Sequence, residues 1–103
     1  MTGKEKRELK TLIREMEMWE YMEVWQSRPW TAVRMVMDGF DGFGFSKVSH
    51  PDEWDESFGS ELALRKAIAN MVREMGHEEA DALLVRMRGE KRLLDRCCQD
   101  GQI

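Results

Sequence analysis

The sequence has few of the residues that staple small folds together. Its 103 residues include two cysteines, two prolines and two histidines. Cys97 and Cys98 are adjacent, so a disulfide between them would be strained, and we expect both to be reduced thiols. Neither histidine lies near them in a zinc-binding spacing. We therefore expect a fold held by its apolar core, with no metal and no cofactor.

Long apolar runs and catalytic patterns are also missing. No stretch of about 18 apolar residues occurs, and no apolar run of signal-peptide length follows the charged N-terminus. We expect a cytoplasmic protein with no membrane contact. His50, with Asp52 or Asp55 to orient it, has the residue types of a general base, but no nucleophile accompanies it. We therefore expect no enzymatic activity.

The chain does have enough apolar sequence for one modest core. Hydrophobic residues make up 42% and charged residues 35%, a balance typical of a folded domain of this length. We expect a single domain over residues 1–103 in the α+β class, mostly helical. Its predicted order is a long N-terminal helix, a two-stranded antiparallel β-hairpin and two C-terminal helices (α-β-β-α-α).

The hairpin is predicted over residues 30–49. Two Asp-Gly pairs between residues 38 and 42 supply the positive backbone dihedrals of a tight reversal, and the turn type stays open. In the first strand Val33, Met35 and Met37 share one face. The opposite face is also largely apolar, so we expect both faces of the hairpin to be covered.

Glycines alternate with phenylalanines in the return strand. Gly42 and Gly44 separate Phe43 and Phe45, and a strand glycine often marks the close approach of another group. We interpret the two glycines as room for a neighbouring aromatic ring, with a ligand cradle as the alternative.

One long helix is predicted over residues 4–27. This segment has no proline or internal glycine, is rich in helix formers, and meets Arg28-Pro29 at its end. Its first half has one apolar side, made of Leu9, Leu12, Ile13 and Met16. In its second half, apolar residues surround the axis: Met18, Trp19, Tyr21, Met22 and Trp25. We therefore expect this half to contact more than one neighbour: the hairpin on one side, and either a second copy in a homodimer or a foreign partner on the other.

Two further helices are predicted over residues 55–75 and 78–98. The inward positions of the first are Leu64, Ile68, Met71, Val72 and Met75. Those of the second are Ala80, Leu83, Leu84, Met87, Leu94 and Cys98. Arg88, Arg92 and Arg96 form a row on the last helix, which suits either phosphate binding or a solvated face.

Negative charge is concentrated in the middle of the chain, whose net charge is −4. Residues 15–61 contain eleven acids and three bases, whereas residues 1–14 contain five bases and two acids. Glu17, Glu20 and Glu23 recur at helical spacing, and Asp52, Glu53, Asp55 and Glu56 surround Trp54. We predict that these eight residues form an acidic partner-binding surface, with Trp54, Trp19 or an exposed methionine as its apolar anchor. A solvated acidic face is the alternative.

One segment resembles a pattern found in small proteins of bacteriophages and prophages. It reads Gly44-Phe45-Ser46-Lys47-Val48-Ser49-His50-Pro51-Asp52-Glu53-Trp54-Asp55 and continues as Gly59-x-x-Leu62-Ala63-x-x-Lys66-Ala67. The resemblance implies a phage origin and an inhibitor of bacterial host defence, such as the anti-CRISPR proteins that occupy basic nucleic-acid grooves. On this hypothesis, the acidic residues bind a host protein with a basic nucleic-acid-binding surface, in the host cytoplasm.

The alternative hypothesis is a small nucleic-acid-binding module. It would use the basic N-terminus, which contains Lys4, Lys6, Arg7 and Lys10, together with the arginine row from Arg88 to Arg96. The predicted order of elements also resembles that of double-stranded-RNA-binding domains. It departs from them by lacking a third strand and a lysine-rich start to the final helix.

Overall fold

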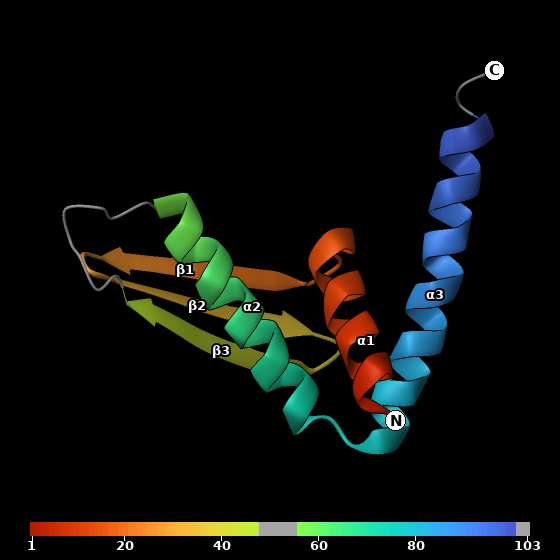
Figure 1. The fold of residues 1–103 in the computed structure, drawn as a ribbon, viewed down its shortest axis with the longest axis horizontal. Helices are drawn as coiled ribbons and strands as arrows, with labels where there is room; N and C mark the ends of the chain where they lie inside the picture. The colour runs from red at the N-terminus through yellow and green to blue at the C-terminus, as the bar shows by residue number, and fades with distance from the viewer. Residues whose placement is uncertain (48–55, 101–103) are drawn as a thin grey trace.

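The structure, a computed structural model, describes the backbone of residues 1–47 and 56–100 and the side chains of residues 1–47 and 58–96. Six elements follow one another, α1 (Gly3–Met16), β1 (Tyr21–Ser27), β2 (Trp30–Met37), β3 (Phe40–Lys47), α2 (Glu56–Glu74) and α3 (His77–Asp100) (Figure 1). The α+β class is confirmed. The strand count is not, because three strands replace the predicted hairpin.

The predicted helix over residues 4–27 is wrong beyond Met16. Thr2 starts α1 with a capping box, in which its hydroxyl accepts from the Glu5 N–H and the Glu5 carboxylate accepts from the Thr2 N–H. Glu17 ends the helix in the left-handed region, at φ 52° and ψ 38°. The chain then forms β1, which pairs with β2 along its whole length. The pairing outweighs the local helix propensity of this segment, because β2 and β3 without a third strand would be a two-stranded ribbon, which is marginally stable in water.

The three strands form an antiparallel sheet in the order β1-β2-β3. A two-residue turn joins β2 to β3, and both of its residues, Asp38 and Gly39, have positive φ, which is the requirement of a type I′ turn. Arg28 and Pro29, joined by a cis peptide bond, connect β1 to β2. The Arg28-Pro29 pair that was expected to end a helix therefore lies in a hairpin turn.

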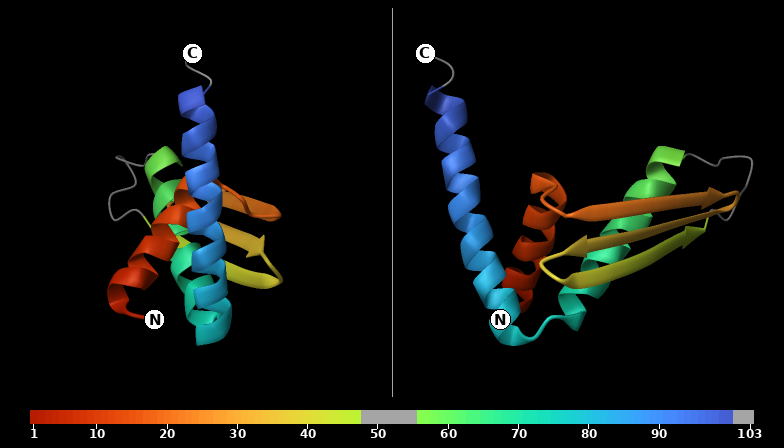
Figure 2. Two further views of the ribbon diagram at one scale, coloured as in Figure 1. Left: turned by 90° about the vertical axis from the view of Figure 1, so that its right-hand side faces the viewer. Right: turned by 180° about the vertical axis from the view of Figure 1, so that it is seen from behind.

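Helix α2 crosses one face of the sheet over β2 and β3, while α1 lies at the end of the strands between α2 and α3 (Figures 1 and 2). The two strand glycines permit this packing. A Cβ atom at Gly42 would overlap the carbonyl of Ala67, and one at Gly44 would overlap the carbonyl of Ala63. The glycines therefore make room for the helix backbone. Because the helix backbone fills that space, the interpretation as room for an aromatic ring is wrong, and no room is left there for a ligand cradle.

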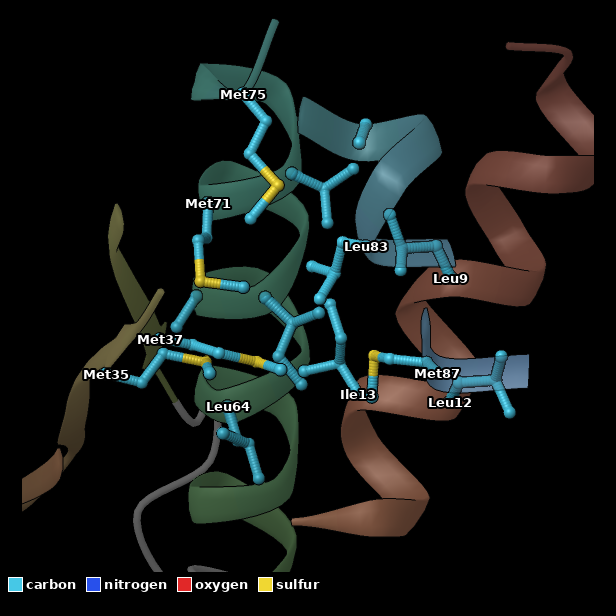
Figure 3. Close-up of a cluster of buried hydrophobic side chains, with 14 of the residues drawn as sticks. Leu9, Leu12, Ile13, Met35, Met37, Leu64, Met71, Met75, Leu83 and Met87 are labelled. Atoms are coloured by element: carbon cyan, nitrogen blue, oxygen red, sulfur yellow. The ribbon is translucent and has the colours of Figure 1, made fainter. Parts of the chain in front are cut away.

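The core lies between the sheet, α2, α1 and α3. Figure 3 shows Met35 and Met37 of β2 facing Met71 of α2, with Ile13 of α1 and Met87 of α3 beyond. The predicted inward residues that are buried are Leu9, Leu12, Ile13, Val33, Met35, Met37, Leu64, Ile68, Met71, Val72, Met75, Ala80, Leu83, Leu84 and Met87. Helical and strand periodicity therefore predicted most of this core correctly.

Three expectations about burial are wrong or lie outside the described residues. Leu94 was predicted to face inward but is 52% exposed, because α3 runs past α1 into solvent (Figure 1). The side chain of Cys98 lies outside the described residues. The sheet was expected to be covered on both faces, yet among the described residues only the face under α2 is buried.

Candidate functional site

The candidate site is the uncovered face of the sheet, which we call the outer face. Side chains alternate along a strand, and β2 buries every second residue from Thr31 to Met37 against the helices. The register therefore places these side chains on the opposite side: Tyr21, Glu23, Trp25, Trp30, Ala32, Arg34, Val36, Asp41, Phe43, Phe45 and Lys47. The right view of Figure 2 looks onto this face, and no helix lies in front of it.

Four aromatic rings form a continuous group on the outer face, the aromatic cluster: Trp25, Trp30, Phe43 and Phe45. Ring centroids of Trp25 and Phe43 are 6.1 Å apart, those of Phe43 and Phe45 are 4.7 Å apart, and those of Trp30 and Phe45 are 6.5 Å apart. The last two pairs meet edge to face, an arrangement that is worth about 0.5–1.5 kcal/mol per pair. The rings thus hold one another in place while 40–52% of each residue stays exposed.

A small hollow lies within the aromatic cluster. Trp25, Trp30 and Phe45 line it together with Ala32 and Ser27, and its volume is about 330 Å³. Ala32 is opposite Trp25 on one side and Phe45 on the other, so its small side chain leaves space between larger neighbours. The hollow is therefore apolar and large enough for one side chain of a partner.

The charges of the outer face are balanced within the face. Arg34 Nη2 lies 2.9 Å from Asp41 Oδ2, and Lys47 Nζ lies 5.3 Å from the centre of the Trp30 ring. Glu23 is opposite Arg34 in the register of β1 and β2. Two acids and two bases therefore surround the aromatic cluster, and both bases already contact groups of their own chain.

The predicted partner-binding acids do not share a helix face. Glu17 caps α1 and lies 3.3 Å from Arg14, while Glu20 precedes β1 and accepts a hydrogen bond from the Asp38 N–H. Glu23 lies on the outer face, in β1.

The side chains of the other predicted site residues lie outside the described part of the structure. His50, Asp52, Glu53, Trp54 and Asp55 lie outside the described residues, and Glu56 begins α2 with its side chain outside them. Of the other expected anchors, Trp19 packs partly buried against the core, whereas Met18 is 42% exposed. A partner-binding role for the predicted residues stays a prediction.

Most of the remaining acids between residues 15 and 61 pair with bases of the same chain. Glu61 binds Arg14 at 2.8 Å and Arg65 at 3.0 Å, which ties α2 to α1. The side-chain hydrogen bond from Arg14 is the main cause that holds the pKa of Glu61 below its ordinary value. Asp38 lies 2.7 Å from Arg86 of α3. Much of the acid in this part of the chain therefore joins elements.

The basic residues are divided in the same way. Arg88 is held by Glu8 through two contacts, of 2.5 Å and 2.9 Å, so the first member of the arginine row is occupied, while Arg92 and Arg96 are exposed. Between α1 and α2 lies a groove of about 690 Å³, lined by Arg7, Lys10, Thr11, Arg14, Glu15, Glu61, Arg65, Ile68 and Ala69. Four bases and two acids therefore line this groove.

Sequence reasoning missed the aromatic cluster. It placed Trp25 on a helix and interpreted the glycines beside Phe43 and Phe45 as space for a ring. The signal was present, because aromatic residues at every second position of a strand share one face. What was missing was the knowledge that α2 occupies the other face.

The chain matches none of the family models, curated proteins or solved structures with which it was compared. Among the described side chains, those of residues 1–47 and 58–96, there is no cluster of three or more metal-ligating groups. No helix in those residues has the length and apolarity needed to cross a membrane. The functional proposal therefore rests on the outer face itself.

Proposed function

We propose that the protein is a binding module that captures another protein through its outer face, with the aromatic cluster as anchor. The supporting observation is that four rings stand half-exposed, in contact with one another and without cover from any described element. Tryptophan and other aromatic residues dominate the energetics of protein interfaces, because they bury a large area and lose little conformational freedom.

The charges favour a protein over a nucleic acid as the occupant of this face. Sheets that bind single strands combine stacking rings with bases that follow the phosphates. Here Arg34 is paired with Asp41, Lys47 lies over Trp30, and the whole chain is acidic. The partner that fits presents a protruding apolar side chain to the hollow over Ala32, flanked by residues of both charges.

The anti-defence hypothesis is compatible with this surface and supplies a candidate partner. In this form of the proposal, the partner is a host protein with a basic nucleic-acid-binding surface, as the resemblance to phage proteins implies. Glu23 supports it, because this predicted partner-binding acid lies beside Trp25 on the outer face. Glu23 would meet a base at the rim while the aromatic cluster fills the centre of the interface.

A paired-variant capture experiment tests the proposal. The double variant Trp25→Ser/Phe45→Ser removes the centre of the aromatic cluster, and Leu93→Ser/Leu94→Ser removes two exposed leucines of α3 as a control. Each protein is immobilised, exposed to bacterial lysate and washed at high salt. We expect mass spectrometry to find a protein retained by the wild type and the control and lost from the outer-face variant. Equal retention by all three would contradict the proposal.

Nucleic-acid binding is the second candidate, and one observation favours it. The third strand gives the order helix, three strands, helix, which removes one of the two departures from double-stranded-RNA-binding domains. The groove beside Arg7 and Lys10 would take the phosphates. A gel shift with duplex RNA and DNA at low salt tests this candidate. It requires retention that falls with salt and is lost in Arg7→Ala/Lys10→Ala.

A further inference from the structure

Strand β1 is an edge strand of the sheet, and no described strand pairs with its outer side. Six of its seven residues are exposed, and the strand contains neither lysine nor proline. On the side of α2, Met22 is 38% exposed and Val24 is 44% exposed, while Tyr21 and Trp25 are exposed on the outer face. A long edge that is apolar on both faces is a template for pairing with another strand, and proteins usually block such edges.

The backbone of this edge points its hydrogen-bonding groups outward at alternate residues. The Glu20 N–H donates to the Val36 carbonyl, which shows that Val36 directs its backbone groups toward β1. Alternation along the register then pairs Tyr21, Glu23, Trp25 and Ser27 with β2. The N–H and C=O groups of Met22, Val24 and Gln26 are therefore the ones directed away from the sheet.

The other edge of the sheet differs from β1. Helix α2 packs along β3, and Asn70 Nδ2 donates to the outward-facing carbonyl of Phe43 at 2.6 Å. Two charged residues, Asp41 and Lys47, also lie along β3. Within the described residues, the sheet therefore has one protected edge and one open edge.

We propose that β1 pairs antiparallel with β1 of a second copy about a two-fold axis at Val24, which joins the two sheets into one of six strands. Val24 then lies opposite its own counterpart, and Met22 lies opposite Gln26 of the other copy. Each of these three pairs exchanges two backbone hydrogen bonds. The occupant is a second copy because the edge is complementary to itself.

Avoidance of like charges favours this register. With the axis at Val24, Glu23 lies opposite Trp25 of the other copy, so no carboxylate within β1 faces another directly. Moving the axis by one residue to Glu23 would place the two Glu23 side chains face to face, which is destabilising.

Pairing in this register also brings the two outer faces side by side, so the aromatic clusters of both copies lie on one surface. The inference does not depend on the proposed function. Substitutions away from the edge and at the edge separate the two, because Phe45→Ser changes the aromatic cluster on β3 and Val24→Lys changes a side chain of β1 on the opposite face.

Molar mass from light scattering over a range of concentrations tests the pairing. We expect the wild type to approach twice the chain mass of 12.1 kDa. Val24→Lys places two ammonium groups opposite each other at the axis, and we expect its dissociation constant to rise at least about tenfold. Val85→Lys is the matched control, because it changes an exposed valine of α3 and should leave the dimer intact.

A backbone probe completes the test. Val24→Pro removes an N–H that faces away from β2, so the variant should keep its sheet by circular dichroism and lose the dimer. A wild type that stays at 12.1 kDa, or a Val24→Lys variant that dimerises normally, would overturn the proposal. So would a dimer that is lost in Phe45→Ser and kept in Val24→Lys.

Discussion

At Gly42 and Gly44 the backbone of α2 occupies the space in which a side chain would otherwise stand. Gly44→Ala would drive a Cβ atom into the carbonyl of Ala63, and neither backbone can move alone. We expect a loss of stability at or above the upper end of about 1–3 kcal/mol, the usual cost of overpacking. Urea denaturation measures it.

Gly89→Ala is the control for that substitution. No atom lies within contact distance of a Cβ at Gly89, which is inside α3. Alanine should therefore stabilise the protein by up to about 1 kcal/mol through helix propensity. If both variants changed stability in the same direction, the close approach of α2 to β3 would not be what determines the outcome.

Glu17 gives a second prediction at the residue scale. It ends α1 with φ 52°, a region that glycine adopts without steric cost. Its contact with Arg14 is exposed and contributes little. We expect Glu17→Gly to raise the free energy of unfolding by about 0.5–1 kcal/mol. Glu15→Gly, two residues earlier within the helix, should lower it, and thermal unfolding compares the two.

At the element scale, α3 consists of a packed half and a solvated half. Leu84 is 1% exposed and belongs to the core, whereas Leu94 on the same helix is 52% exposed. We expect Leu84→Ala to cost about 2–5 kcal/mol, because it leaves a cavity. Leu94→Ala should cost less than about 0.5 kcal/mol. Denaturation curves of the two variants measure the difference directly, and similar losses would show that the end of α3 is packed.

The elements differ in how well the sequence predicts them. The inward faces of α1, α2 and the first half of α3 follow from a local period of 3.6, which needs no knowledge of the rest of the chain. β1 could not be recognised in this way. Its glutamate, methionine and glutamine are helix formers, and its apolar residues point to both sides because it is an edge with two exposed faces. This segment forms a strand because it pairs with β2, which needs a neighbour on its free side.

At the scale of the whole molecule, ion pairs join elements that are distant in the sequence. Glu61 links α2 to α1, and Glu8 links α1 to α3. Hydrogen bonds from Arg14 and from Arg88 lower the pKa of these two carboxyls in the folded state. Because the folded pKa is the lower one, the stabilisation is present above the unfolded value and is lost as the pH falls.

We therefore expect the urea midpoint of the wild type to fall as the pH drops below about 4.5, the ordinary glutamate value. Glu61→Gln should be less stable at pH 7 and should lose less between pH 7 and pH 3. Glu74→Gln changes an exposed carboxylate of α2 and should follow the wild type. Parallel curves for the wild type and Glu61→Gln would contradict the role of this pair.

The candidate site also belongs to this scale, which explains why sequence alone did not find it. The pattern of Trp30 to Met37 shows two faces but does not say which one a helix will cover. That choice depends on the small residues of β3 and α2, which are brought together only in the folded chain. The exposure of the aromatic cluster follows from it.

The contact between Gly42, Gly44, Ala63 and Ala67 has a consequence for how this protein can evolve. These four positions set the distance between α2 and the sheet, so a larger residue at any of them would separate the layers. The methionines that fill the rest of the layer, such as Met35, Met37 and Met71, are unbranched and adaptable. In diverged descendants we expect leucine or isoleucine to replace the methionines freely, while the four small residues persist.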